Sequence, residues 1–302
     1  MILHKFARIS LIFPICLLLC FLTETTHPEL NKSNPFADYA DVCHEIFSRH
    51  LQAFRQVHIY LPPSYSESEQ NYSVLYINDG QDMKLLKLKK KLNALYLLNK
   101  IEEVIVVSIP AGNRMQEYGT ASQPDYQKRG SLAGKYSKFI INELMAFVNA
   151  QYRTKKLAKS TSFIGFSLGG LTAFDLVWNY PMFFGKAGAF SASFWWRSKA
   201  FEDGFKEDKD RIMHNIVKKS NHKRGLKFWF QAGTEDEKSD RNKNGIIDAI
   251  DDTLDLMKEL RHKGYKNKLD MHYEEVEGGE HNYQTWSAIF PKFMLWAYGT
   301  EN

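Results

Sequence analysis

Residues 161–170 read TSFIGFSLGG, and this stretch decides the fold. The apolar run before Gly165 predicts a short strand, and the residues from Leu168 onward are typical of a helix. Ser167 lies between them in a G-x-S-x-G pattern, whose small residues permit the strained strand-to-helix turn that lifts a serine hydroxyl off a sheet. The first turn of the helix would direct free backbone N–H groups at the same place. The stretch therefore predicts a nucleophilic serine.

Strand and helix signals alternate on both sides of this turn. Val104–Ile109 (VIVVSI) is a continuous apolar, β-branched run, as expected of a strand covered on both faces. Lys135–Tyr152 carries apolar residues at spacings of three and four, which predicts a helix with one apolar stripe. The other predicted strands are Arg55–Leu61, Tyr72–Asn78, Phe163–Gly165, Lys186–Ser191, Leu226–Ala232 and Leu269–Val276, and the other predicted helices are Leu168–Trp178, Asp252–Arg261 and Tyr283–Trp296. The alternation predicts an α/β fold with a mostly parallel central sheet and helices on both faces, in one domain over residues 51–302.

The first 22 residues have the pattern of an export signal. Basic residues precede an apolar run of 14 residues, Ile9–Leu22, which is shorter than the roughly 20 residues of a membrane-spanning helix. We expect residues 1–22 to be a signal peptide that is removed, which leaves an exported protein, periplasmic or secreted, with no membrane span. Cys20 follows three leucines as in a bacterial lipobox, but Leu19 replaces the small residue of that motif, so a lipid anchor is the less favoured alternative. We expect residues 23–50 to be a polar leader segment, and no small-x-small triplet marks the cleavage site.

The composition excludes several classes of protein. A chain of 302 residues that is 44% apolar and 25% charged is neither disordered nor collagen-like. The formal charge is 40 − 35 = +5, and it falls to 38 − 35 = +3 without residues 1–22, so no nucleic-acid partner is expected. Lys84–Lys91 (KLLKLKKK) is most simply the solvated face of a helix. Cys43 is the one cysteine after the signal segment, so the fold does not rely on an intramolecular disulfide.

A serine nucleophile needs a histidine base and an acid that orients it. His281 lies in Glu277–Asn282 (EGGEHN), a predicted glycine-rich loop between the last predicted strand and the last helix. Its place agrees with the α/β-hydrolase chain order of serine, acid and histidine. For the acid, Thr234–Glu237 (TEDE) follows the predicted strand Leu226–Ala232 and would lie at the same edge of the sheet. The residues alone leave Glu235 and Asp236 open.

Two backbone amides are candidates for stabilising an oxyanion. The N–H of Leu168 directly follows the serine, and the N–H of Gln81 follows the predicted strand Tyr72–Asn78, where Gly80 permits a close backbone approach. The irregular stretches 111–134 and 197–225 follow strands and are candidates to shape the entrance of the site. Trp195 and Trp196 either line a substrate pocket or pack in the core.

Residues 240–251 have the spacing of a calcium-binding loop. Oxygen-bearing side chains stand at positions 1, 3, 5, 9 and 12, a glycine at position 6 makes the turn, and position 7 offers a main-chain carbonyl. The candidate ligands are Asp240, Asn242, Asn244, Ile246, Asp248 and Asp251. The loop follows a strand rather than a helix, so it would be half of the usual helix–loop–helix unit. Our hypothesis is that a structural calcium ion braces the nearby acid-bearing segment; the alternative is an acidic loop that caps a helix.

Seven motifs together carry a family resemblance. IYLPPSY, LYINDGQD, EYGTASQPDY, GFSLGG, SASFWW, AGTED and GGEHN occur in this order between Phe54 and Trp296. With them the chain resembles the esterase D or enterochelin-esterase-like family of α/β-hydrolases. The resemblance implies a serine esterase acting on carboxylic esters or thioesters. Its site would comprise Ser167, Asp236 rather than Glu235, and His281 as catalytic triad, with the amides of Gln81 and Leu168 as oxyanion hole.

The same resemblance leaves the substrate open. The family includes siderophore esterases, feruloyl and acetyl esterases of plant polysaccharides, acyltransferases and formylglutathione hydrolases. We therefore expect a small-molecule or glycan ester as substrate and no cofactor for catalysis. The alternatives are an acyltransferase on this fold and a non-catalytic, ligand-binding homologue. The oligomeric state is not indicated.

Overall fold

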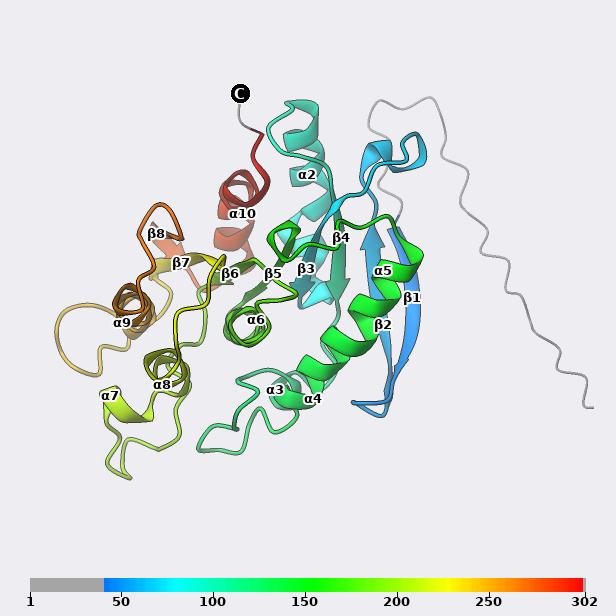
Figure 1. Cartoon of the computed structure of the whole chain (residues 1–302). Coiled ribbons are helices and arrows are strands. Elements are labelled where there is room, and N and C mark those ends of the chain that lie inside the picture. Colours follow the sequence, from blue (N-terminus) through cyan, green and yellow to red (C-terminus); the bar gives the residue numbers. More distant parts are fainter. Residues whose placement is uncertain (1–40, 301–302) are drawn as a thin grey trace, which may run out of the picture.

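The computed structural model describes residues 41–300, which build one eight-stranded sheet in the order β1-β2-β4-β3-β5-β6-β7-β8 (Figure 1). Strands β1 and β2 pair antiparallel with each other and β2 pairs antiparallel with β4, whereas every pair from β4 to β8 is parallel. The strands are β1 (Asp41–Ser48), β2 (Ala53–Tyr60), β3 (Ser73–Asn78), β4 (Val104–Ile109), β5 (Thr161–Phe166), β6 (Lys186–Phe190), β7 (Lys227–Glu235) and β8 (Met271–Glu280). The predicted mostly parallel α/β sheet is confirmed.

Helices cover both faces of the sheet (Figure 1). The helices are α1 (Met83–Leu86), α2 (Leu88–Leu97), α3 (Arg114–Glu117), α4 (Ala133–Lys138), α5 (Met145–Gln151), α6 (Leu168–Asn179), α7 (Glu207–Asp210), α8 (Ile212–Lys219), α9 (Asp248–His262) and α10 (Tyr283–Tyr298), with a π-helical turn at Phe139–Leu144 and 3₁₀ turns η1 (Pro63–Ser66), η2 (Gly80–Asp82) and η4 (Ala158–Ser160). One buried cluster joins the sheet to α4, α5, α6, α8 and α9, and the other joins it to α1, α2 and α10. Successive residues of a central strand alternate between the clusters: Ile105 and Val107 belong to the first, and Val104 and Val106 to the second.

Several predicted boundaries differ from the structure. Strand β1 (Asp41–Ser48) lies inside the segment 23–50 that we expected to be a polar leader, so the sheet begins at least ten residues before position 51. Strand β8 continues through the predicted loop to Glu280, because Gly278 and Gly279 form an irregular, bulged extension that pairs with β7. The basic helix over 84–91 is divided at Lys87, which has a positive φ of 56°. The predicted signal peptide lies outside the described residues; within residues 41–300, no helix is long and apolar enough to cross a membrane.

The parallel strands place their carboxyl ends along one edge of the sheet. Strands β3, β5, β6 and β7 end there at Asn78, Phe166, Phe190 and Glu235. The segments that follow these ends carry the residues of the candidate site, as expected for an open α/β sheet.

Candidate functional site

Ser167 occupies a strained turn between β5 and α6. Its backbone angles are φ 54° and ψ −124°, a conformation that costs a non-glycine residue roughly 1–3 kcal/mol. The turn is tight, because a Cβ atom at Gly165 would lie 2.2 Å from the carbonyl oxygen of Gly169. The Ser167 N–H donates to the Phe190 carbonyl at 2.9 Å, and the Ser193 N–H donates to the Ser167 carbonyl at 3.1 Å. The neighbouring strand end of β6 therefore fixes the strained residue, whose side chain remains partly accessible.

Asp236 and His281 face each other across the ends of β7 and β8. The Asp236 Oδ1 lies 3.6 Å from the His281 Nδ1; the carboxylate is fully buried, whereas the histidine side chain is 40% exposed. The Ser191 hydroxyl donates to Asp236 Oδ1 at 3.0 Å, and the Gly233 N–H donates to Oδ2 at 2.9 Å. Glu235, the other candidate for the acid, is exposed at the end of β7, where its backbone lies opposite that of Glu280 in β8. The structure thus brings Asp236 to the histidine and leaves Glu235 outside.

Ser191 and Trp286 support this pair and were missed by sequence reasoning. Ser191 follows β6 with a positive φ of 42°, is buried, and accepts a hydrogen bond from the Trp286 indole N–H at 2.9 Å. The Trp286 ring packs edge-on against the His281 ring, with centroids 5.2 Å apart. Trp286 therefore contacts both the histidine and the serine that holds the acid. The SASFWW motif marked this strand end, but neither the φ angle nor the distant indole partner can be read from it.

The two candidate oxyanion amides lie on adjacent strand ends. Gln81 is in η2, the 3₁₀ turn directly after β3, and Leu168 is the first residue of α6. Neither amide donates a hydrogen bond to any group within residues 41–300. A Cβ atom at Gly80 would lie 2.6 Å from the backbone nitrogen of Ile109, so only glycine lets this turn pack against the end of β4.

Two cavities lie next to Glu237, the residue that follows Asp236. One of about 760 Å³ includes Thr234, Glu235, His281 and Asn282 in its wall, and one of about 270 Å³ is lined by aromatic and arginine side chains. Both cavities have Glu237 in their walls, and burial raises the pKa of that carboxyl group, with nearby Asp248 adding to the effect. The lining of the smaller cavity is Tyr126, Gln127, Arg129, Trp195, Arg197, Phe201, Phe205, Glu237, Ser239, Arg241 and Asp248.

The smaller cavity involves two features that the sequence singled out. Both irregular stretches, 111–134 and 197–225, contribute to its wall, and their role at the entrance of the catalytic site stays a prediction. The two tryptophans have different roles: Trp195 lines the cavity, whereas Trp196 is fully buried and packs against Gly119 and Gly130.

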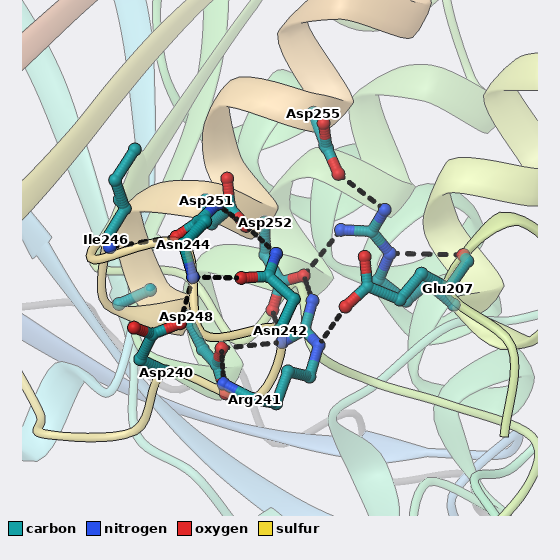
Figure 2. Close-up of polar contacts among 12 residues, drawn as sticks. Glu207, Asp240, Arg241, Asn242, Asn244, Ile246, Asp248, Asp251, Asp252 and Asp255 are labelled. Carbon is teal, nitrogen blue, oxygen red and sulfur yellow. Dashed lines mark hydrogen bonds and ion pairs between the residues drawn. The ribbon is translucent and has the colours of Figure 1, made fainter.

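Residues 240–247 form a loop, and Asp248–Asp251 form the first turn of α9, which begins four residues before the predicted helix start at Asp252 (Figure 2). The side-chain amides of Asn242 and Asn244 both donate to Asp251 Oδ2, at 2.6 and 3.1 Å. Asp240 accepts the backbone N–H groups of Asn244 and Gly245, at 3.1 and 2.9 Å. Asp248 does not join this group: its Oδ1 accepts the backbone N–H of Arg241 at 3.0 Å. Four of the candidate calcium ligands therefore gather between the loop and the first turn of α9.

The part of the chain that the structure describes has no group of three or more His, Cys, Asp and Glu side chains suited to a metal ion. Three of the six predicted calcium ligands are of other kinds, namely two asparagine side chains and one main-chain carbonyl.

Comparison with known proteins agrees with this architecture. The family model described as "Putative esterase" matches residues 48–297. Among solved structures, a ferulic acid esterase is 17% identical with a TM-score of 0.66, and the match covers 86% of this chain and 98% of that one. An IroE-like serine hydrolase from Shewanella oneidensis is 23% identical with a TM-score of 0.64, covering 84% of this chain and 78% of the other. The enterobactin esterase of Shigella flexneri is 18% identical with a TM-score of 0.65, covering 85% of this chain and 58% of the longer enzyme.

At these identities the three solved structures establish the fold, and the family match covers most of the chain. The chain therefore belongs to this esterase family, and it is a carboxylic ester hydrolase with the α/β-hydrolase fold.

Proposed function

We propose that the protein is a serine esterase that works through an acyl-enzyme intermediate, with Ser167 as nucleophile, His281 as base and Asp236 as the acid that orients it. The observation that carries the proposal is the buried Asp236 carboxylate facing His281, at the same edge of the sheet as the strained Ser167. The distance of 3.6 Å between Asp236 Oδ1 and His281 Nδ1 is longer than an ordinary hydrogen bond. Such long contacts are common in catalytic sites that have not yet bound a substrate.

Each residue has one task in this mechanism. The Ser167 hydroxyl attacks the ester carbonyl carbon while His281 accepts its proton, and His281 then returns the proton to the leaving alkoxide. Water enters with His281 again as base and releases the acid from Ser167. Asp236 stabilises the imidazolium, and its carboxylate is held in place because the Ser191 hydroxyl and the Gly233 N–H both donate to it. The free N–H groups of Gln81 and Leu168 would hold the oxyanion.

The smaller cavity suggests the class of ester. Its wall combines four aromatic rings with the Arg197 guanidinium, which lies 4.0 Å from the Phe201 ring and donates to the Tyr126 hydroxyl at 3.2 Å. A volume of about 270 Å³ can hold one planar aromatic group. One of the similar structures carries the name of an esterase for an aromatic acid, ferulic acid. We therefore propose an ester with an aromatic acid group as substrate.

A matched ester panel tests this function. We expect hydrolysis of feruloyl and dihydroxybenzoyl esters to exceed that of an acetyl ester of the same alcohol, and Ser167→Ala to abolish all three activities. Equal rates on the three esters would contradict the aromatic assignment while leaving the esterase intact. Adding a competing alcohol distinguishes the acyltransferase alternative, which would divert the acyl group to the alcohol instead of water.

We also propose that residues 240–251 bind a structural calcium ion. The donor set supports the fit: Asp251 already attracts two asparagine side chains, and each amide can present its oxygen instead of its nitrogen after a half-turn. Each carboxylate oxygen of Asp240 accepts one backbone N–H of the loop. Each oxygen therefore keeps a further lone pair that can bind a cation. Arg241, in the same loop, forms ion pairs with Glu207 and Asp252 (Figure 2). An ion bound by Asp240 and Asp251 would add a second restraint to the loop, which begins four residues after Asp236.

A further inference from the structure

We propose that Arg114 is a positioning residue that holds the two halves of the oxyanion hole at a fixed separation. The inference rests on the proposed serine-esterase mechanism, in which the Gln81 amide comes from the end of β3 and the Leu168 amide from the end of β5. Arg114 contacts the residue two positions before each of these amides, Asp79 in one case and Phe166 in the other. It lies on α3, the short helix after β4, and its guanidinium reaches across the strand ends.

The first contact is a bidentate ion pair with Asp79. The Arg114 Nε donates to Asp79 Oδ1 at 2.8 Å and the Nη2 donates to Oδ2 at 3.0 Å. The same Nη2 donates to the Phe166 carbonyl at 3.3 Å, and Phe166 immediately precedes Ser167. One planar side chain therefore bridges the segment that leads into Gln81 and the segment that leads into Leu168. A lysine has neither the fork nor the reach in two directions.

Asp79 transmits this restraint to the Gln81 amide. Asp79 is buried, adopts the left-handed conformation with φ 59°, and precedes Gly80–Gln81. Its N–H donates to the Tyr118 hydroxyl at 3.1 Å, and its carbonyl accepts the Asp82 N–H at 3.0 Å. The Tyr118 and Asp82 contacts hold the Asp79 backbone and Arg114 holds its carboxylate, so all three restrain the residue from which the turn to the Gln81 N–H begins.

Arg114 also balances a charge that would oppose catalysis. The Asp79 carboxylate lies against the start of α6, where its Oδ2 is 2.7 Å from the position of a Cβ atom on Gly169. A lone negative charge there would repel the developing oxyanion. Burial alone would lower the pKa of Arg114, but its hydrogen bonds to Asp79 outweigh that effect and raise the pKa, so the arginine stays charged. Position and charge are thus two separable effects of one side chain.

Arg114→Lys tests the proposal, with Arg153→Lys as the matched control. Arg153 also donates to a backbone carbonyl, that of Tyr65, and lies over the Tyr65 ring as Arg114 lies over Tyr118, but it follows α5 near the amino ends of β3 and β5. We expect Arg114→Lys to lower kcat about 10–100-fold with KM within about twofold, because the lost interaction acts in the transition state. The affinity for a trifluoromethyl ketone, which mimics the tetrahedral intermediate, should fall by the same factor. Arg153→Lys should change neither.

A second variant separates positioning from charge balance. Arg114→Gln leaves Asp79 buried and unpaired, whereas the double variant Asp79→Asn/Arg114→Gln removes both charges and should recover the melting temperature. If Arg114 positions the hole, the double variant stays slow despite its recovered stability. A double variant with wild-type kcat, or an Arg114→Lys variant with unchanged kcat, would overturn the inference. Failure of the serine mechanism itself is seen separately, as a wild-type protein that a fluorophosphonate does not label.

Discussion

Ser191→Ala removes the hydroxyl that joins the acid to the tryptophan beside His281. Ser191 donates to Asp236 at 3.0 Å and accepts the Trp286 indole N–H at 2.9 Å, and all three residues are buried. The variant therefore loses one hydrogen bond to a charged group, worth about 1.5–3 kcal/mol, and leaves a buried N–H unpaired, which costs about 1–3 kcal/mol. Because the two terms overlap, we expect the free energy of unfolding to fall by about 2–4 kcal/mol.

The catalytic effect should exceed what lost stability explains. Asp236 keeps one donor, the Gly233 N–H, so its carboxylate can rotate away from His281. We expect kcat to fall roughly tenfold, less than the ~10⁴-fold cost of losing the aspartate charge in a triad. Urea unfolding and steady-state hydrolysis measure the two effects. Ser287→Ala is the control, since its hydroxyl donates to the Leu86 carbonyl at 2.8 Å, one residue from Trp286. If Ser191→Ala lost stability but kept the kcat of the control, the proposed support of the acid would be wrong.

Three further predictions concern the fold, the cavity and the loop. Burial raises the pKa of Asp175 to about 7 in the folded state, from 3.8 for the ordinary side chain. Between these two pH values the folded chain therefore binds one proton more than the unfolded chain. The free energy of unfolding should fall by up to about 4 kcal/mol as the pH rises through this window. Asp175→Asn should therefore flatten the urea-unfolding free energy between pH 4 and 7 and be more stable than wild type at about pH 8; an unchanged pH profile would refute the assignment. Trp195→Ala should raise KM for a feruloyl ester about 3–10-fold and leave KM for an acetyl ester unchanged, since only an aromatic group would stack on the indole; equal effects on both esters would place the aromatic group elsewhere. Saturating calcium should raise the melting temperature of chelator-treated protein by about 5 °C, and Asp251→Asn should abolish this shift. A melting temperature that changes with neither chelator nor calcium would contradict the proposed calcium site.

The residues that local sequence could predict are those whose role depends on a local pattern. Ser167 follows from a strand–turn–helix motif, and His281 from its place after the last strand. The choice of Asp236 over Glu235 depended on the family resemblance, because adjacent residues at a strand end differ in burial only once the sheet is formed.

The supporting residues could not be predicted, because each acts through a partner far along the chain. Arg114 meets Asp79 across 35 residues, and Ser191 meets Trp286 across 95. Strand β1 was missed for a different reason: it lies at the edge of the sheet and alternates exposed and half-buried residues, so its composition resembles that of a polar segment. Strand β8 was predicted too short, because two glycines that usually end a strand here form a bulge.

Labelling with a fluorophosphonate, followed by intact-mass and peptide analysis, tests the serine-esterase mechanism most directly. The mechanism predicts one adduct per chain, on Ser167. Labelling should be lost in Ser167→Ala and strongly slowed in His281→Ala, and it should track the loss of ester hydrolysis. An enzyme that hydrolyses esters but carries no adduct, or carries it on another residue, would contradict the mechanism.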